Sequence, residues 1–177
     1  MNRVLVAGIG NIFMGDDGFG CEVAQRLSRC ELPEDVDVVD FGIRGMDLGY
    51  ALMDGYALAI LIDTADRQEP PGTICVIEPE IEDAGIEQGQ SDGYLFAPHA
   101  MDPAQVLKFI SSLGDRRPRL LMVACQPETL GGEQGHMGLS AAVTAAVEVA
   151  VRQVRELLED ESRGQDKDQS ETAAMLA

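Results

Sequence analysis

The chain has 177 residues, a length that predicts one domain with enough apolar sequence to form a core. Its 31 acidic and 13 basic side chains give a net charge of −18, which would repel nucleic acid and anionic lipid and excludes both as expected partners. Three features favour the reducing cytoplasm. The four cysteines are widely spaced without a CxxC pair, the sequence has no signal-peptide pattern, and no apolar stretch reaches membrane-spanning length.

The first predicted element is a short apolar strand, residues 3–8, that leads into a glycine-rich turn. Such a run is typical of a strand buried on both faces of a parallel sheet. A helix is expected to follow, because apolar residues recur every four positions from Phe19 to Leu27. Asp16 and Asp17 lie between strand and helix, at the carboxyl end of the strand, where open α/β sheets bind ligands.

This turn has two competing interpretations. Gly8 and Gly10 have the spacing of the first two glycines of a dinucleotide-binding GxGxxG motif, and Asp40 closes the next strand like a ribose-binding acid. Against a dinucleotide, the third glycine position is Phe13, which is too large for close helix–strand packing, and the two aspartates would repel a pyrophosphate. The same carboxylates suit a cation, although the first of them could equally serve as a helix N-cap.

Residues 36–41 are predicted to form a second strand, and a helix should begin at Gly45. Met46, Tyr50 and Met53 lie at helical spacing there, a pattern that more often marks core positions than a cofactor site. We therefore expect these three side chains to face the core.

The third predicted strand, residues 57–63, is the most apolar of the chain and is expected at the centre of the sheet. It ends in an acid, Asp63. If the first and third strands are parallel, as their crossovers require, Asp17 and Asp63 face one crevice at a shared edge of the sheet. The alternative is that Asp63 caps the turn that follows it, a common role of aspartate.

A fourth strand, residues 73–78, follows after about nine residues, which are too few for a parallel crossover helix and predict an antiparallel edge strand. The sequence from 79 to 97 lacks periodicity and is expected to form a long surface loop. The loop ends at Pro98, which would fix the approach of His99 before another helix. A histidine in that place is more often a cap or a solvated side chain than a ligand, and His136 is its only competitor.

The last strand is predicted over residues 119–125, followed by a long helix, residues 139–158, with Ser140 in its cap region. Apolar residues recur along one stripe of this helix, which should cover one face of the sheet. Beyond the helix the acids cluster and large apolar residues are almost absent, which predicts a disordered tail. The expected organisation is one domain, residues 1–158, and an acidic tail, residues 159–177.

Several short motifs occur in a specific order along the chain. They are GIGNIFMGDDGFG at residues 8–20, GIRGMDL at 42–48, an apolar strand ending in Asp63, Pro98-His99, QPE at 126–128 and GLS at 138–140. Together they resemble the hydrogenase maturation proteases, endopeptidases that trim the C-terminus of the large subunit of nickel–iron hydrogenases. The resemblance covers residues 3–158.

The resemblance implies an α/β fold: a three-layer sandwich whose twisted, five-stranded, mostly parallel sheet has one antiparallel edge strand and helices on both faces. It also implies a metal-binding and catalytic triad, which falls on Asp17, Asp63 and His99 of this chain. The implied substrate is the large-subunit precursor after nickel insertion, cut beyond its final metal-ligating segment. Nickel is therefore expected to arrive with the substrate, and zinc or cadmium could take its place in a crystal.

No Ser/His/Asp, Cys/His or HExxH arrangement is evident, so we expect a captured metal to polarise the scissile carbonyl or activate a water while Asp17 or Asp63 accepts a proton. Asp16 would lie outside the ligand set. Two other classes stay open: a nickel-dependent chaperone that holds the large subunit without cutting it, and a nucleotide-binding α/β domain that uses Gly8 and Gly10. Small size and strong like charge favour a monomer.

Overall fold

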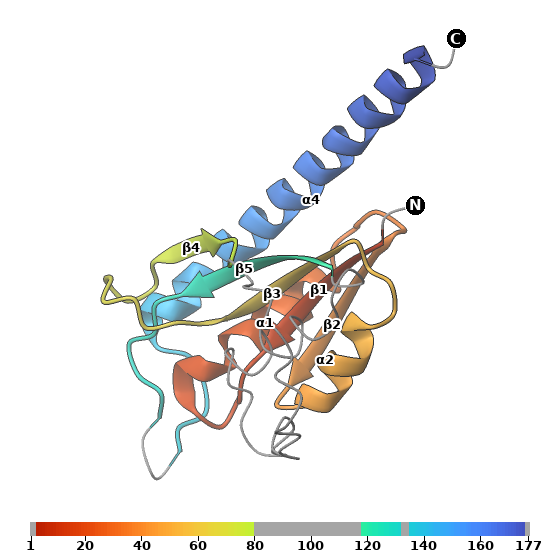
Figure 1. Cartoon of the computed structure of the whole chain (residues 1–177). Coiled ribbons are helices and arrows are strands. Elements are labelled where there is room, and N and C mark those ends of the chain that lie inside the picture. Colours follow the sequence, from red (N-terminus) through yellow and green to blue (C-terminus); the bar gives the residue numbers. More distant parts are fainter. Residues whose placement is uncertain (1–2, 80–117, 132–134, 176–177) are drawn as a thin grey trace, which may run out of the picture.

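The structure is a computed structural model that describes residues 3–79, 118–131 and 135–175, with side chains described up to residue 163. Five strands form one sheet in the order β2-β1-β3-β5-β4 (Figure 1). The strands are β1 (Val4–Ile9), β2 (Val36–Gly42), β3 (Leu58–Thr64), β4 (Ile74–Ile77) and β5 (Arg119–Cys125). All pairs are parallel except β4 with β5, so the predicted antiparallel edge strand and the central third strand are both confirmed.

Helices cover both faces of the sheet, as expected. The helical elements are the 3₁₀ helix η1 (Gly15–Gly18), α1 (Phe19–Leu27), α2 (Gly45–Leu52) and α4 (Ala141–Met175). One core cluster joins α1 and α4 to one face, and a second cluster joins α2 to the other. The loop predicted beyond residue 79 and the helix predicted after His99 lie outside the described residues.

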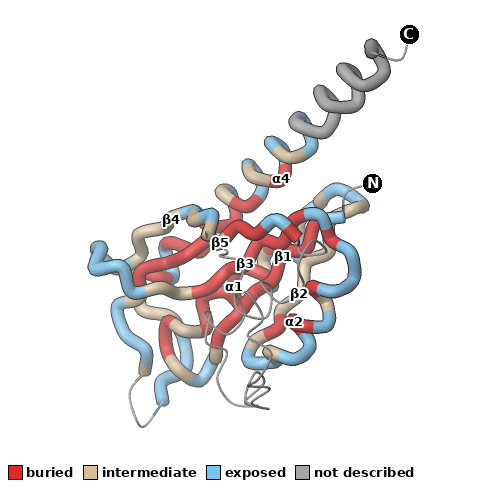
Figure 2. The backbone as a smooth tube through the Cα atoms, viewed as in Figure 1, coloured by how far each residue is buried: buried red, intermediate tan, exposed pale blue. Residues whose placement is uncertain are grey.

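The strand β1 divides its side chains between these two clusters. Val4 and Val6 contact the α1 and α4 layer, whereas Leu5 and Ala7 contact the α2 layer, because successive side chains of a strand point to opposite faces. All of β1 is buried, and the buried residues of Figure 2 concentrate along the central strands. The continuous apolar run therefore marks a strand covered on both faces.

The helix α1 begins directly on the sheet because Gly20 has no side chain. A Cβ atom at Gly20 would overlap the carbonyl oxygens of Ile9 and Ile62, at the carboxyl ends of β1 and β3. Phe13, which was judged too large for the third glycine position of a dinucleotide motif, lies in the turn and is 59% exposed. The turn is longer than a dinucleotide-binding one, so the close contact falls on a later residue.

Substitution of Gly20 by alanine is expected to destabilise the fold by about 3 kcal/mol, because the added methyl must displace backbone rather than a flexible side chain. Gly18→Ala is the matched control. Gly18 has φ of −72°, which alanine adopts without strain, and its nearest contact would be the Cα of Ile12 at 3.1 Å. Urea unfolding of both variants tests the expectation, and equal midpoints would contradict it.

The prediction that Met46, Tyr50 and Met53 face the core is wrong. These side chains are 46%, 65% and 59% exposed, whereas Leu48 and Leu52 of the same region are fully buried. Both sets of residues recur at helical spacing, so the periodicity of the sequence alone allowed either set to face the core. The leucines take the sheet side, where they join the cluster formed by β1 and β3.

The helix α4 begins as expected but ends later. Ser140 caps it, since its Oγ accepts the backbone N–H of Val143 at 3.3 Å. The helix end predicted at Leu158 is wrong, because α4 continues to Met175 and extends past the sheet (Figure 1). Pairs at helical spacing, such as Arg163 with Glu159 at 3.4 Å, support this extension. Among the described side chains of α4, Leu158 is the last one in the core, and the division of the chain at residue 158 stays a prediction.

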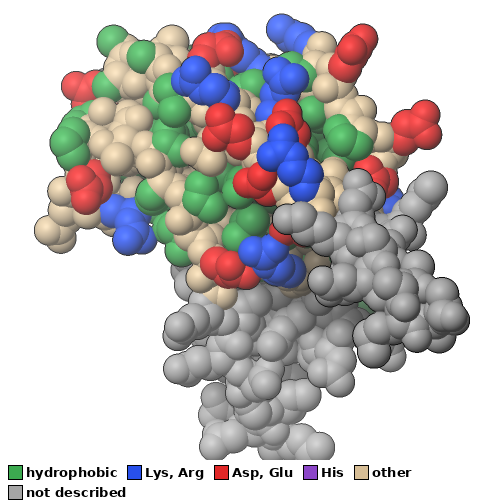
Figure 3. All heavy atoms as spheres, turned by 90° about the horizontal axis from the view of Figure 1, so that it is seen from above, with side chains coloured by type: hydrophobic (Ala, Val, Ile, Leu, Met, Phe, Trp, Pro, Cys, Tyr) green, Lys and Arg blue, Asp and Glu red, His purple; other side chains and the backbone are tan. Residues whose placement is uncertain are grey.

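The end of the sheet at which the parallel strands begin carries exposed ion pairs. Arg3 pairs with Asp37 at 2.6 Å, and Arg119 pairs with Glu78 at 2.7 Å. Figure 3 views the molecule from above, where acidic and basic side chains lie close to one another. Exposed pairs of this kind contribute at most about 1 kcal/mol each. Among the helices in the described ranges, none has the length and hydrophobicity of a membrane span.

Candidate active site

The candidate site lies where β1 and β3 end. These strands are parallel and in register, with Gly8 opposite Ile62, so the residues that follow them share one edge of the sheet. The chain runs from β1 to β2 on one side of β1, and β3 lies on the other side of β1. This is the topological switch point of a doubly wound sheet, the usual ligand site of such folds. Asp17 and Asp63 are both found there.

Asp63 is a buried acid, with 5% of its surface exposed. Burial raises the pKa of its carboxyl to about 7; the N–H of Thr64, which donates to Oδ1 at 2.7 Å, opposes the rise, and the negative charge of Asp17 adds to it. The influence of Asp17 shows that the two carboxylates are electrostatic neighbours. A cation between them would favour the ionised form of both.

Asp63 is not the only aspartate that caps the turn after β3. The Oδ1 of Asp66 accepts the N–H of Gln68, two residues further along the chain, at 3.1 Å. The side chain of Asp63 bonds only to the adjacent Thr64 among the described residues. The capping interpretation therefore explains Asp66 better than Asp63.

Asp17 is half-buried and oriented by the turn that precedes it. Its Oδ2 accepts the backbone N–H of Asn11 at 2.7 Å. The Oδ1 of Asn11 in turn accepts the N–H of Phe13 at 3.0 Å, which closes the turn on itself. One carboxylate oxygen of Asp17 is thus fixed by the backbone, while the group stays partly accessible.

Asp16 has a structural role that the sequence did not reveal. It is fully buried and accepts three backbone N–H groups, from Glu128 at 2.8 Å, Thr129 at 2.9 Å and Ser140 at 2.6 Å. Burial alone would raise its pKa, but the hydrogen bonds from Ser140, Thr129 and Glu128 outweigh burial and leave the pKa lowered. Asp16 therefore stays ionised and joins the loop after β5 to the start of α4.

The N-cap interpretation of Asp16 is wrong. The N-cap positions of η1 and α1 are Met14 and Gly18, and neither helix start receives a side-chain hydrogen bond. Asp16 instead binds loops more than 100 residues away along the chain. The QPE and GLS motifs were the available signal, since they contain two of its partners, Glu128 and Ser140.

A nucleotide is a poor fit for the glycine-rich turn. A Cβ atom at Gly10 would overlap the carbonyl oxygen of Asp17, so the chain itself occupies the space that a pyrophosphate would need. Asp40 contacts α1: its Oδ2 accepts a hydrogen bond from the Nε2 of Gln25 at 3.1 Å. Cys21 beside it is buried, and burial raises the pKa of its thiol to about 12, with Asp40 adding to the rise. The thiol of Cys21 donates to the carbonyl of Gly10 at 3.4 Å.

Gln126, from the QPE motif, holds the chain that follows Asp63. Its Oε1 accepts the N–H groups of Arg67 at 2.7 Å and Glu69 at 3.3 Å, and its Nε2 donates to Asp66 at 3.1 Å. The side chain is 9% exposed. Sequence reasoning placed this motif at the carboxyl end of a strand but did not foresee these contacts.

The third predicted ligand, His99, lies outside the described residues. Its competitor His136 is exposed, and its backbone pairs with Phe13 rather than with the acids. Within residues 3–79, 118–131 and 135–163, no three His, Cys, Asp or Glu side chains form a group that could hold a metal. Two carboxylates alone are hard oxygen donors, and an added imidazole would make a set that suits nickel or zinc.

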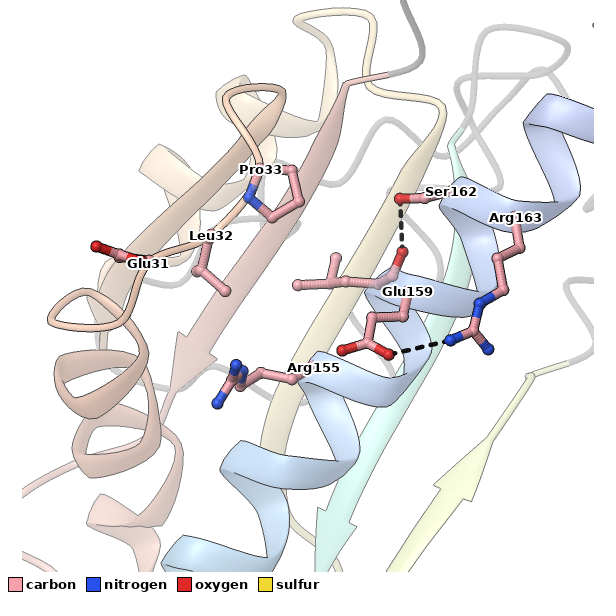
Figure 4. Close-up of a pocket in the computed structure, with 8 residues that line it drawn as sticks. Glu31, Leu32, Pro33, Arg155, Glu159, Ser162 and Arg163 are labelled. Atoms are coloured by element: carbon pink, nitrogen blue, oxygen red, sulfur yellow. Dashed lines mark hydrogen bonds and ion pairs between the residues drawn. The ribbon is translucent and has the colours of Figure 1, made fainter.

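A separate groove lies far from these acids. It has a volume of ≈ 390 Å³ and lies between the α1–β2 connection and the outer part of α4 (Figure 4). Leu32 and Pro33 line one side, and Arg155 lies on the other. Because Pro33 precedes the start of β2, the groove lies toward the amino ends of the strands, and it has no part in the candidate site.

The fold and this edge define a class: a doubly wound α/β protein with an acidic site at its switch point. A sequence model described as hydrogenase maturation protease matches residues 21–157, and the chain belongs to this family of endopeptidases. The chain is 31% identical to the hydrogenase 2 maturation protease of Escherichia coli over 153 residues, which cover 86% of this chain and 88% of that protein.

The fold is shared with solved structures of this family. The hydrogenase maturating endopeptidase HybD from E. coli superposes with a TM-score of 0.70 and 28% identity, covering 90% of this chain and 93% of that one. The hydrogenase 2 maturation peptidase from a Thaumarchaeota archaeon superposes with a TM-score of 0.67 and 36% identity, covering 89% and 98%. The chain is therefore a hydrogenase maturation endopeptidase.

Proposed function

We propose that this endopeptidase removes the C-terminal peptide of a nickel–iron hydrogenase large-subunit precursor after nickel insertion, in the cytoplasm. The observation that carries the proposal is the buried carboxyl of Asp63 beside Asp17 at the switch point. Burying an acid next to a second acid costs stability, and a cation shared by both would offset that cost. The names of the relatives support a hydrogenase as the client.

In this proposal the nickel belongs to the substrate and is recognised by Asp17, Asp63 and His99. Ligation by all three would make cleavage conditional on the metal, because a precursor without nickel lacks the group that the carboxylates attract. The metal would supply Lewis acidity to the scissile carbonyl or to a water. Zinc or cadmium would fit the same donors in a crystal.

The protein's own residues supply orientation and a base. The N–H of Asn11 fixes one oxygen of Asp17, and the N–H of Thr64 fixes one oxygen of Asp63. Among the contacts of the described residues, each carboxylate keeps a second oxygen for a ligand or a proton. Asp17 is the more accessible of the two and is the better placed to take a proton from solvent.

The wild-type protein is expected to shorten a nickel-loaded precursor and to leave a metal-free precursor intact. Asp17→Ala and His99→Ala should both abolish the shortening while the proteins stay folded. Asp54→Ala is the control, since Asp54 is an exposed acid near the opposite end of the sheet. Mass spectrometry of the mixed proteins measures the loss of the terminal peptide directly.

Three outcomes would count against the proposal. Full cleavage by Asp17→Ala and His99→Ala would remove both from the ligand set. Equal cleavage of the metal-free precursor would remove the metal requirement. Binding of the loaded precursor without any shortening would favour a nickel-dependent chaperone of the large subunit instead.

A further inference from the structure

Among the residues that the structure describes, four large apolar side chains are exposed on the loops that follow β1 and β5. Ile12 is 46% exposed, Phe13 59%, Leu130 48% and Met137 67%. We call these four residues the rim patch. Exposed apolar side chains on neighbouring loops are typical of interaction sites, whereas single ones need no explanation.

The rim patch is held together by backbone contacts between loops distant in sequence. The N–H of His136 donates to the carbonyl of Phe13 at 3.0 Å, and the N–H of Gly15 donates to the carbonyl of His136 at 2.6 Å. On the other side, a Cβ atom at Gly131 would lie 3.0 Å from the Cα of Met14. The patch is therefore formed before any partner binds, and little conformational entropy is lost on binding.

The same loop that carries the rim patch also orients the site. Asn11 donates to Asp17 through its backbone and accepts from Phe13 through its side chain, so Ile12 and Phe13 lie within the turn that positions this carboxylate. The Ile12–Phe13 part of the rim patch is thus adjacent to Asp17.

The charges of the site restrict what can bind there. Asp17 and Asp63 are both acidic, and the chain carries a net charge of −18. An acidic segment, or a second copy of this chain, would be repelled. An apolar segment attached to a metal cation fits both the patch and the acids.

We propose that the rim patch is the docking surface for the substrate, and that it takes apolar side chains of an extended precursor segment next to the metal. This inference rests on the proposed function and deepens it. It assigns to Phe13 and Met137 a role in binding the precursor, separate from the chemistry at the carboxylates.

The double variant Phe13→Ser/Met137→Ser tests the proposal with nickel-loaded precursor. KM is expected to rise about tenfold or more, with kcat changed less than about twofold, because the lost contacts bind the substrate without acting on the scissile bond. The thermal midpoint should not change, since both side chains are mostly exposed. Val149→Ser is the control: Val149 is 41% exposed on α4 and should leave KM unchanged.

Several results would overturn the docking surface. An unchanged KM in the double variant would do so directly. A fall of several degrees in the thermal midpoint would show that the patch is covered by the chain itself, and a change of sedimentation coefficient would show that a second copy covers it. Binding measured by calorimetry separates this inference from the protease proposal. If the wild type binds loaded precursor more tightly than the double variant but cuts nothing, only the protease proposal fails.

Discussion

Asp63→Asn is expected to abolish precursor cleavage and, at the same time, to stabilise the fold at alkaline pH. Asparagine keeps an oxygen for the N–H of Thr64, so the local hydrogen bond survives. It removes the charge that a metal would need, and we expect cleavage to fall about a thousandfold or more. The same change removes a buried charge, which is the source of the gain in stability.

The pH dependence of this gain has a definite sign. The pKa of Asp63 is raised to about 7 in the native state from an ordinary value of 3.8, chiefly by burial. Between these values the native state binds a proton that the unfolded state has lost, so the contribution of Asp63 to stability is present below pH 4 and disappears as pH rises through 7. The shift corresponds to up to about 4 kcal/mol at pH 8.

Urea unfolding of the wild type and Asp63→Asn at pH 4 and pH 8 measures the effect. The two proteins should unfold at similar urea concentrations at pH 4, and the variant should be more stable at pH 8. Asp54→Asn, which changes an exposed acid, serves as the control and should show no such difference. A stability difference that is the same at both pH values would contradict the assignment of the raised pKa to Asp63.

Asp16→Ala is expected to have the opposite effect and to destabilise the fold by about 4–6 kcal/mol. Three buried N–H groups, of Glu128, Thr129 and Ser140, would lose their acceptor, and each unsatisfied group costs about 1–3 kcal/mol. Because the pKa of Asp16 is lowered, its contribution is present above the ordinary value of 3.8 and is lost as pH falls below it.

The neighbour Asp17 provides a matched control for this prediction. Asp17→Ala removes an acceptor for one N–H, that of Asn11, and the side chain is only half-buried, so we expect a loss of about 1 kcal/mol. Unfolding of both variants in urea at pH 7 compares them directly. If Asp16→Ala unfolded at the wild-type midpoint, the three hydrogen bonds would not hold the loops together as described.

Adjacent aspartates therefore serve different purposes. Asp16 stabilises the fold by fixing the loop after β5 and the start of α4, and Asp17 is left accessible beside Asp63. Asp63 is an acid that opposes folding at neutral pH, a cost typical of residues retained for function. A double substitution of Asp16 and Asp17 would therefore change the stability of the fold and the candidate site together.

Much of the fold followed from the sequence. The apolar runs located the strands, and the short gap before β4 predicted its antiparallel place at the edge of the sheet. The same reasoning put Asp17 and Asp63 at one edge, because parallel strands joined by crossovers end together. These features depend on chain spacing and connection length, which a sequence contains explicitly.

The sequence was misleading where two local patterns competed. Met46, Tyr50 and Met53 have a helical spacing as good as that of the two buried leucines, and only contact with β1 and β3 decided which stripe is buried. The end of α4 was placed too early because loss of apolar residues was taken as loss of helix. The assignment of His99 as a ligand rests on its motif and stays a prediction.

By itself, the sequence determined which residues form the strands and which acids end them, because strand and helix periods are properties of neighbouring residues. Only the tertiary structure decided how far those acids are buried and which groups donate hydrogen bonds to them. Asp16 meets donors more than 100 residues away, and Asp63 loses its solvent, so one pKa is lowered and the other is raised. Both shifts arise from burial and from hydrogen bonds, which exist only after distant segments pack together.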